Sequence, residues 1–331
     1  MTKIRIAQYG TKHGHARGKV VALQSHPDVE LAGVFEPDVA QRQQLQEAEG
    51  PFQPVHWFET EDEMLADKTI IAVASEGQNS ESLAQTAAIV QAGKHVWYDK
   101  PAGEDWAQWQ TVVADAKRQN LLIQMGYMFR YHTGFRTIAD WARSGLLGNI
   151  FSIRAHMSTF ISAEQRRVVG EHQGGIMFDL GGHVLDQIVW TMGRPHTVTS
   201  FLRNDDTLVA NFTDNTLTVL EYDRGIAFVD IAAMETKPMA RRYEVYGDRG
   251  SAIIVDPFEP AETIRLCLDA ARDGYQAGEQ FIPLDIQSRQ SLYDLALDSF
   301  LATITGHKDA DRSYEHELLV QETLLRVTGK I

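Results

Sequence analysis

Apolar and polar positions alternate in blocks over roughly the first 125 residues of the sequence. Short apolar runs are typical of buried strands, and the stretches between them repeat apolar residues with helical periodicity. The predicted strands are residues 4–9, 29–35, 69–74, 95–98 and 121–125. The predicted helices are residues 16–25, 39–49, 81–92 and 106–119. Strict alternation of strand and helix predicts a parallel sheet covered by helices on both faces.

The pattern changes in the second part of the chain. Helical periodicity, stopped by glycine in the first two cases, predicts helices at residues 135–144, 178–192, 292–304 and 315–327. Residues 197–254 are rich in strand formers and contain several turn signals, as expected of an antiparallel sheet. The sequence therefore predicts an α/β protein with one domain over residues 1–125 and a second α/β domain over residues 126–331.

The composition narrows the function classes. The 331 residues are 44% hydrophobic and 23% charged, which is ordinary for a globular protein. A formal net charge of −14 provides no broad basic field for a phosphate backbone, so we expect no nucleic-acid partner. Cys267 is the single cysteine, which excludes an intramolecular disulfide. We find no targeting segment and no apolar run of about 18 residues, so we expect a cytoplasmic protein without membrane association.

The turn after the first predicted strand is a candidate nucleotide site. It reads Gly-Thr-Lys-His-Gly-His over residues 10–15, and only Gly10 matches the glycine fingerprint of dinucleotide-binding domains. Its position suits a pyrophosphate, because a helix that follows the first strand offers amide donors and a favourable dipole. We therefore predict cofactor contacts from Gly10, Lys12, His13 and His15 in a Rossmann domain, the alternative being an ordinary glycine-bearing turn.

Glu36 supports this interpretation. It ends the second predicted strand, where a carboxylate accepts hydrogen bonds from both hydroxyls of the adenosine ribose. The same charge repels the extra phosphate of NADP, and Pro37 and Asp38 supply no compensating cation. We therefore predict NAD as the cofactor, with NADP less favoured. A plain surface carboxylate at a strand end is the alternative.

Two further segments resemble the signatures of one enzyme family. Residues 92–101, Ala-Gly-Lys-His-Val-Trp-Tyr-Asp-Lys-Pro, are similar to the Ala-Gly-Lys-His-Val…Glu-Lys-Pro segment of the glucose–fructose oxidoreductase/inositol dehydrogenase family (Gfo/Idh/MocA). Residues 174–186 resemble its second signature, a glycine pair followed by Asp-x-Gly-x-His-x-x-Asp, and residues 143–148 are also similar. The resemblance implies a Rossmann domain joined to an α/β domain with an open, mainly antiparallel sheet.

The resemblance also implies roles for single residues. Lys100 is expected beside the nicotinamide and the substrate oxygen, with Asp179 and His183 facing them from the other domain. Asn79 and Asp99 are expected at the cofactor, although Asp99 stands where the family has glutamate and Asn79 belongs to a Gly-Gln-Asn stretch that replaces Thr-Pro-Asn. The open sheet forms a subunit interface in many members, which implies a homodimer or homotetramer.

The residue types suit the oxidation of an alcohol. Asp179 and His183 are four apart, so they share one face of a helix. Histidine is suited to take the hydroxyl proton, while the nicotinamide takes the hydride. Asp179 can orient the imidazole, and Lys100 can stabilise the developing alkoxide. We predict an NAD-dependent oxidoreductase that acts on a secondary alcohol of a sugar, polyol or sugar derivative. The alternative is a structural Asp179–His183 pair and a solvated Lys100.

Four residues are candidates for substrate binding. Tyr127 and Arg130 follow the last predicted strand of the first domain, and Arg166 and His172 precede the second signature. Each is also a plausible surface or packing residue. The substrate is expected to be a small molecule, and the pattern does not identify it.

Three other functions remain open. The family contains glycosidases that use a tightly bound nicotinamide for transient oxidation, so a glycosidase or epimerase-type enzyme is the first alternative. The His13-x-His15 pair, with His156 and His172, also fits a metal-dependent amidohydrolase, but that fold requires eight strand–helix units. A non-enzymatic sensor is the third. In the favoured interpretation we expect no metal ion.

Overall fold

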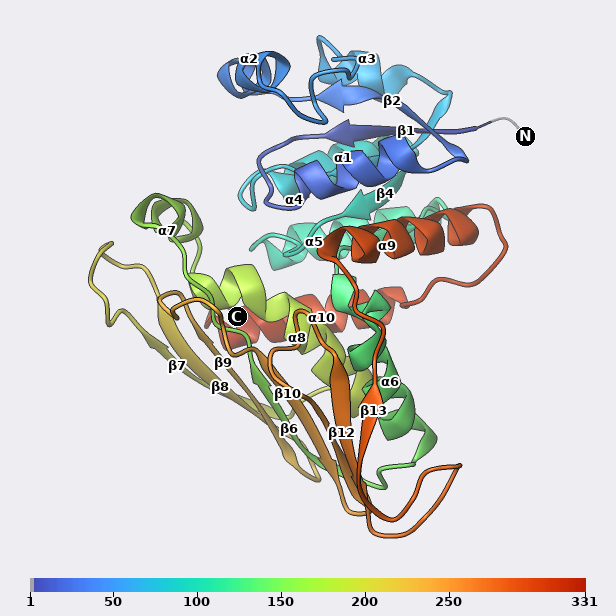
Figure 1. The fold of residues 1–331 in the computed structure, drawn as a ribbon. Coiled ribbons are helices and arrows are strands. Elements are labelled where there is room, and N and C mark those ends of the chain that lie inside the picture. Colours follow the sequence, from blue (N-terminus) through green and yellow to red (C-terminus); the bar gives the residue numbers. More distant parts are fainter. Residues whose placement is uncertain (1–2) are drawn as a thin grey trace. The chain divides into compact units, whose positions relative to one another are not determined.

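A computed structural model describes residues 3–331 of the chain, as drawn in Figure 1. The chain forms two compact units, each built on one sheet. The first unit contains the residues up to Gly126 together with Arg289–Leu318, and the second contains Tyr127–Ser288 and Leu319–Ile331.

The first unit is built on a five-stranded parallel sheet in the order β2-β1-β3-β4-β5. Its strands are β1 (Ile4–Tyr9), β2 (Val29–Phe35), β3 (Ile70–Ser75), β4 (His95–Tyr98) and β5 (Ile123–Met125). The chain runs outward from β1 to β2 and then crosses to the other side of β1 to form β3. The carboxyl ends of β1 and β3 therefore mark the topological switch point, where open α/β sheets bind their ligands. This sheet confirms the prediction of a Rossmann-type fold.

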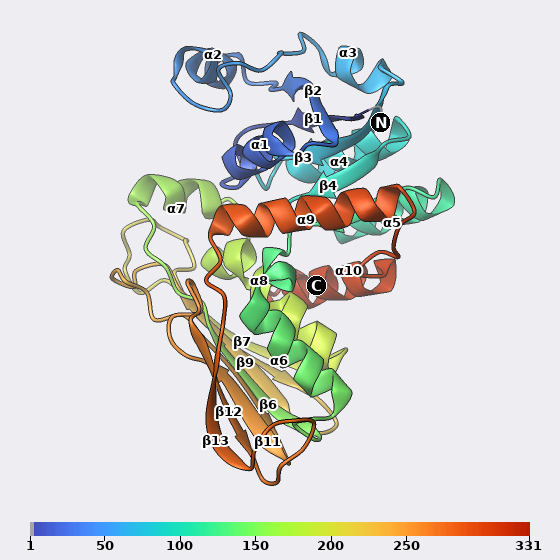
Figure 2. The same ribbon diagram turned by 45° about the vertical axis from the view of Figure 1, so that its right-hand side comes forward.

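The helices of the first unit follow the predicted alternation. They are α1 (Ala16–Ser25), α2 (Val39–Glu47), α3 (Glu61–Ala66), α4 (Ser82–Gln91), α5 (Trp106–Arg118), α9 (Arg289–Ile304) and the start of α10 (Tyr314–Val327). The short helix α3 was not predicted. Figure 2 shows α9 in orange-red beside α1, although the two come from opposite ends of the chain. A Cβ atom at Gly18 would lie 2.4 Å from the ring of Tyr293, so glycine lets α1 and α9 pack closely.

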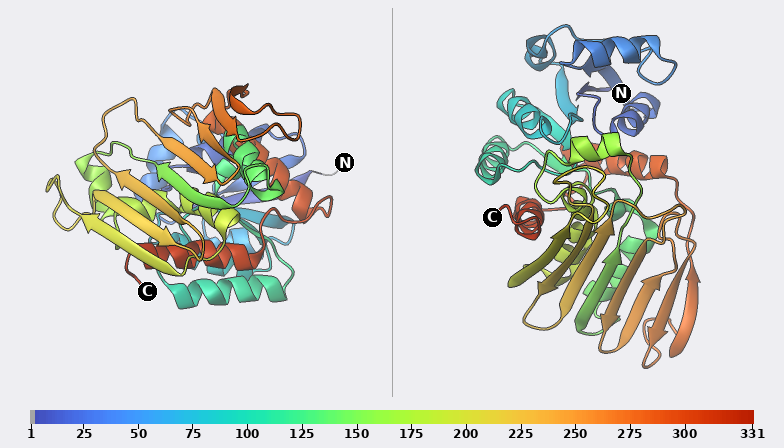
Figure 3. Two further views of the ribbon diagram at one scale, coloured as in Figure 1. Left: turned by 90° about the horizontal axis from the view of Figure 1, so that it is seen from below. Right: turned by 90° about the vertical axis from the view of Figure 1, so that its left-hand side faces the viewer.

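The second unit is built on an eight-stranded sheet in the order β13-β12-β11-β10-β6-β9-β8-β7, seen strand beside strand in Figure 3. All neighbours are antiparallel except β6 and β9. The strands are β6 (Ile150–His156), β7 (Thr197–Arg203), β8 (Asn215–Glu221), β9 (Ile226–Ala232), β10 (Arg242–Gly247), β11 (Gly250–Ile254), β12 (Thr263–Leu268) and β13 (Gly278–Pro283). The predicted, mainly antiparallel sheet is confirmed, and it extends beyond the β-rich stretch at residues 197–254.

Helices cover one face of this sheet. They are the 3₁₀ turn η1 (Met128–Tyr131) and the helices α6 (Thr133–Ser144), α7 (Ala163–Val169) and α8 (Ile176–Met192), of which α6 and α8 pack on the strands. Side chains alternate along each strand, so Ile153 and Val229 are buried beneath the helices while Arg154 points to the other, open face. Within residues 3–331, no helix is both long enough and apolar enough to cross a bilayer.

The glycine pair of the second signature fixes the start of α8. Gly175 caps the helix with φ of +48°, a conformation that favours glycine. A Cβ atom at Gly175 would lie 2.4 Å from the backbone oxygen of Thr213, and one at Gly174 would lie 2.3 Å from a side-chain carbon of Thr328. Both close contacts lie within the second unit. The pair therefore seats the beginning of α8 against two neighbouring segments.

A buried histidine begins α6. The Nδ1 atom of His132 accepts hydrogen bonds from the amides of Gly134 (3.1 Å) and Phe135 (3.5 Å). Burial lowers the pKa of His132 from 6.5 to about 4, because the charged imidazole is poorly solvated. Protonation at Nδ1 would also remove the acceptor that caps the helix. The neutral form of His132 is therefore the one that the fold uses.

We expect this histidine to make the stability of the protein depend on pH. The pKa is lower in the folded than in the unfolded chain, so stability is complete above about pH 6.5 and is lost as the pH falls toward 4. Between pH 7.5 and about pH 5.5, His132 should account for a loss of about 1 kcal/mol in the free energy of unfolding. His132→Asn keeps a capping acceptor that does not titrate and should reduce the pH dependence by that amount.

Urea denaturation at the two pH values, followed by circular dichroism, measures this difference. His307→Asn, at an exposed position, is the matched control and should behave like the parent protein. An equal pH dependence in His132→Asn and the parent would show that His132 is not the cause.

Candidate functional site

The loop after β1 packs closely against the loop after β3. Gly10 has φ of +83°, and a Cβ atom there would lie 2.6 Å from the backbone nitrogen of Gly77. A Cβ atom at Gly77 would in turn lie 2.2 Å from the side chain of Gln85. The first glycine of the fingerprint is thus required by the contact between the two loops. A Cβ atom at Gly14 would meet no atom within 4 Å, so the start of α1 is accessible beside this residue.

Glu36 holds the same loop from the end of β2. Its Oε2 atom accepts hydrogen bonds from the amide (2.8 Å) and the hydroxyl (2.7 Å) of Thr11, and its Oε1 atom accepts one from the amide of Asp38 (3.0 Å). Only 3% of Glu36 is exposed. The carboxylate is therefore buried against the loop after β1 rather than on the open surface, and its role as a ribose acceptor stays a prediction.

Lys12 is paired with two acidic side chains. Its Nζ atom lies 2.9 Å from Oε1 of Glu81 and 3.3 Å from Oδ2 of Asp38. Asp38 also caps α2 through the amides of Ala40 and Gln41. The charge of Lys12 is therefore balanced within the first unit, and the surroundings of Glu36 carry two further carboxylates.

A buried cluster of charged and polar side chains lies below the loop. Lys19 of α1 places its Nζ atom 2.5 Å from Glu76, which follows β3, and 3.1 Å from Asp99, which follows β4. The Nδ1 atom of His15 lies 3.0 Å from Oδ2 of Asp99. The Nδ1 atom of His13 lies 3.6 Å from Oε2 of Glu76 and 3.6 Å from Oδ2 of Asp99. The structure thus brings the predicted residues His13, His15 and Asp99 together.

The charges in this cluster depend on one another. Burial lowers the pKa of His15 to about 4 despite the attraction of Asp99, so its imidazole is neutral at neutral pH. Burial acts in the same direction on the pKa of Lys19, but attraction to Asp99 and Glu76 outweighs it and raises that pKa. Burial would raise the pKa of Asp99, yet the neighbouring histidines and Lys19 hold it well below its usual value. Burial also raises the pKa of Glu76.

Sequence reasoning missed Lys19 and Glu76. The signal for Lys19 was available, because it follows Ala16 and precedes Val20 and Leu23 on the apolar face of a helix, where a lysine is buried only if it is paired. Glu76 stands one residue after the buried strand β3 and offered no comparable signal. Thr11, the donor to Glu36, was also missed.

Lys100 and Asn79 complete the predicted residues of the first unit. Lys100 lies two residues after β4, is buried, and donates its backbone amide to Oδ1 of Asp99 (2.8 Å). A Cβ atom at Gly126 would lie 2.6 Å from Oδ1 of Asp99, so glycine after β5 makes room for this carboxylate. Asn79 is half-buried between β3 and α4. All predicted cofactor residues thus follow the carboxyl ends of β1 to β4.

The predicted acid–base pair lies in the second unit. Asp179 and His183 are one turn apart on α8, with Asp179 half-buried and His183 buried. The ring of His183 lies 5.2 Å from the ring of Phe129 in η1, centroid to centroid. A Cβ atom at Gly182 would lie 3.4 Å from the ring of Tyr127, an ordinary van der Waals contact.

Arg130, a predicted substrate residue, forms a buried ion pair within the second unit. Its Nε and Nη2 atoms lie 2.7 Å and 2.9 Å from the two carboxylate oxygens of Asp186 on α8. Its guanidinium also stacks over Trp190, 3.8 Å from the ring centroid. Bidentate pairing and stacking fix the arginine strongly. Arg130 therefore joins η1, which carries Phe129, to the helix that carries His183.

The other two predicted substrate residues are packed elsewhere in the second unit. Arg166 pairs with Asp206 and donates from Nη2 to the backbone oxygen of Ala233 (3.1 Å). His172 stacks on Phe178 with 4.8 Å between ring centroids. Their roles in substrate binding stay predictions.

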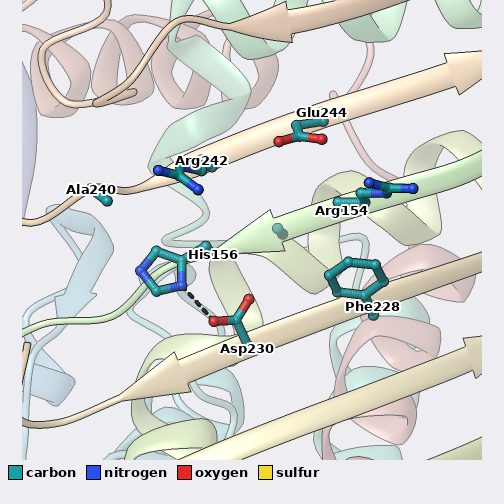
Figure 4. A pocket seen from close by; sticks show the side chains of 8 residues that line it. Arg154, His156, Phe228, Asp230, Ala240, Arg242 and Glu244 are labelled. Carbon is teal, nitrogen blue, oxygen red and sulfur yellow. Dashed lines mark hydrogen bonds and ion pairs between the residues drawn. The ribbon is translucent and has the colours of Figure 1, made fainter.

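A pocket opens on the uncovered face of the eight-stranded sheet (Figure 4). It is lined by charged side chains on β6, β9 and β10, with His156 bonded to Asp230 at 2.5 Å. This hydrogen bond raises the pKa of His156. None of the predicted catalytic residues lines the pocket.

A Rossmann unit followed by a largely antiparallel eight-stranded sheet defines a class of two-part α/β proteins. Residues 4–127 match the family described as "Oxidoreductase family, NAD-binding Rossmann fold", and residues 135–253 match the "GFO/IDH/MocA C-terminal domain". The chain belongs to the Gfo/Idh/MocA oxidoreductase family, as the resemblance predicted.

Individual relatives are distant. An uncharacterized oxidoreductase of Schizosaccharomyces pombe is 26% identical over 64% of this chain and 60% of its own length. The 1,5-anhydro-D-fructose reductase of Ensifer adhaerens is 24% identical over 74% of this chain and 73% of its own. The structure of GenD2 from gentamicin A biosynthesis, solved with NAD, matches with a TM-score of 0.79 at 20% identity, covering 99% of this chain and 95% of that one. The chain thus spans less than two thirds of the S. pombe relative.

Proposed function

We propose that this protein is an NAD-dependent dehydrogenase that oxidises a secondary alcohol of a sugar, polyol or sugar derivative. The observation that carries the proposal is that both family signatures are present with their reactive side chains. Lys100 follows the carboxyl end of a parallel strand, and Asp179 and His183 share one face of α8. The proposal assigns all three residues to the same chemical step. The sugar reductase among the relatives supports a hydroxylated substrate.

The residues of the first unit fit a dinucleotide. Helix α1 has ten residues and no acidic residue in its first turn. A Cβ atom at Gly14, just before the helix, would meet no atom within 4 Å, so there is free space beside the helix start. Glu36 is held at the edge of the same loop, where it can accept from ribose hydroxyls. When bound, the nicotinamide supplies a hydride acceptor. Glu36 would hold the adenosine end, and the amides at the start of α1 would hold the diphosphate.

His183, Asp179 and Lys100 act on the hydroxyl group of the substrate. His183 takes the hydroxyl proton on an imidazole nitrogen as the carbon loses its hydride, and Asp179 favours the charged imidazole that results. Lys100 donates a hydrogen bond to the same oxygen and stabilises it as negative charge develops. Arg130, through Asp186, sets the position of α8 and thereby of His183.

The acidic surroundings of Glu36 favour NAD over NADP. A 2′-phosphate would meet Glu36, and Lys12 is already balanced by Asp38 and Glu81. We expect the parent protein to bind NAD more tightly than NADP. Glu36→Gln keeps an acceptor for Thr11 but removes the charge, so it should narrow the preference, and Glu36→Arg should narrow it further or reverse it.

Calorimetric titration of both cofactors measures the ratio of the two dissociation constants, which does not depend on a general loss of affinity. Glu49→Gln, at an exposed position, is the control and should keep the parent ratio. Tighter binding of NADP by the parent protein would overturn the assignment.

Lys100→Met should lower turnover by at least about 100-fold and leave most of the NAD affinity intact. Its proposed hydrogen bond strengthens only as charge develops on the substrate oxygen, so its loss affects the transition state more than binding. Lys117→Met, an exposed lysine on α5, is the matched control and should keep parent activity. A panel of polyols, sugars and sugar acids with NAD, followed at the nicotinamide absorbance, identifies the substrate for this measurement. Unchanged turnover would return Lys100 to a structural role.

His183→Ala should lower turnover by roughly 100- to 10,000-fold and abolish the rise of kcat/KM with pH, because it removes the group that accepts the proton. Asp179→Asn should cost less and shift that rise to lower pH, since a charge that favours the imidazolium is lost. Deuterium at the oxidised carbon shows whether chemistry limits the measured rate. A His183→Ala enzyme with the parent's pH profile would place the base elsewhere. Hydrolysis of glycosides without net NAD reduction would favour the glycosidase alternative.

A further inference from the structure

We propose that His13, His15 and Asp99 bind one divalent metal ion of the zinc class below the loop that follows β1. One ring nitrogen of each histidine and one carboxylate oxygen of Asp99 lie within 4.8 Å of one another. The proposal replaces the expectation from the sequence that no metal is bound. It concerns metal binding alone and does not depend on the proposed dehydrogenase activity.

The distances suit a tetrahedral site. Zinc bonds of about 2.0–2.2 Å at tetrahedral angles place the ligand atoms about 3.3–3.6 Å apart. The Nδ1 atom of His15 lies 3.0 Å from Oδ2 of Asp99, and Nδ1 of His13 lies 3.6 Å from the same oxygen. Both separations are within a few tenths of an ångström of the required value. Small side-chain rotations would therefore form the site.

The hydrogen bonds around His13 also favour a cation. Its Nδ1 atom accepts the amide of His15 at 3.2 Å, which makes this nitrogen an acceptor. The same atom faces carboxylate oxygens of Glu76 and Asp99 at 3.6 Å each. The Nδ1 atom of His13 and the Asp99 oxygen, two of the proposed ligand atoms, are therefore both acceptors that a metal ion between them would attract.

The charge balance leaves room for a cation. Glu76 and Asp99 carry two negative charges, and Lys19 supplies one positive charge between them. Two carboxyl groups thus face a single ammonium group. Lys19 is also the competitor of the metal, because its ammonium lies 3.1 Å from the Asp99 oxygen that would be a ligand. Removing the lysine should therefore strengthen metal binding.

The ligand types select the metal. Two imidazoles and one carboxylate suit Zn²⁺, Co²⁺ or Ni²⁺, whereas Mg²⁺ and Ca²⁺ prefer sets of oxygen ligands. A bound ion would connect the loop after β1, through His13 and His15, to the loop after β4, through Asp99. Lys100 directly follows Asp99, so the ion would act as a clamp on the segment that carries the proposed catalytic lysine.

Cobalt titration of the full-length protein, stripped of metal with a chelator and without NAD or substrate, tests the proposal. We expect one equivalent of Co²⁺ to produce the visible absorption of a tetrahedral site and to be displaced by one equivalent of Zn²⁺. His13→Gln, His15→Gln and Asp99→Asn should each weaken Co²⁺ binding by at least about 10-fold. Lys19→Met should strengthen it, which a chance contact with surface histidines would not explain.

The control is His156→Gln. His156 also lies between two carboxylates, but its two ring nitrogens face different ones, Asp230 and Glu235, so they cannot chelate one ion. This variant should bind Co²⁺ like the parent. Circular dichroism identifies any variant that fails to fold. Lys19→Met tests the site by an increase in Co²⁺ affinity, which misfolding would not produce. Absence of Co²⁺ and Zn²⁺ binding by the parent, or equal binding by the parent and all three ligand variants, would overturn the proposal.

Discussion

The interaction on which the first unit depends is the buried ion pair between Lys19 and the carboxylates of Glu76 and Asp99. It joins α1 to the ends of β3 and β4, the three segments that meet at the switch point of the parallel sheet. Each charge is tolerated in the interior only because the others are present. Removing one partner of such a group typically costs about 3–5 kcal/mol. The ion pair between Lys19 and Asp99 therefore fixes the position of the Asp99–Lys100 segment.

In the second unit, glycine residues and a buried arginine hold the helix α8 in place. Gly174 and Gly175 let the chain enter α8 close to the side chain of Thr328 and the backbone of Thr213. The bidentate pair of Arg130 and Asp186 then fixes the rotation of α8. His183 lies between these constraints, so its position is set by residues that do not themselves carry chemistry. In both units a proposed catalytic residue lies close in sequence to a buried, paired carboxylate. Lys100 follows Asp99, and His183 precedes Asp186 by three residues.

The fold was largely predictable because periodicity reports burial, and burial alternates with the same period as secondary structure. Strands β1 to β5 and the helices between them follow directly from that pattern. It could not show that α9 belongs beside α1, since contacts between distant segments leave no local period. Part of the site at the loop over residues 10–15 was not predictable for a related reason, because it also depends on contacts between distant segments. Glu36 was visible from its place at a strand end, whereas the roles of Thr11 and Glu76 depend on side chains brought near by the crossover of the sheet.

The departures of this chain from the family pattern explain one another. A histidine at position 15, where the fingerprint has glycine, places an imidazole beside the residue before Lys100, and that residue is aspartate where the family has glutamate. A longer side chain at position 99 would have to share the space that Gly126, His15 and Lys19 already limit. The side chains at positions 15, 19 and 99 therefore limit one another, because they share one buried space.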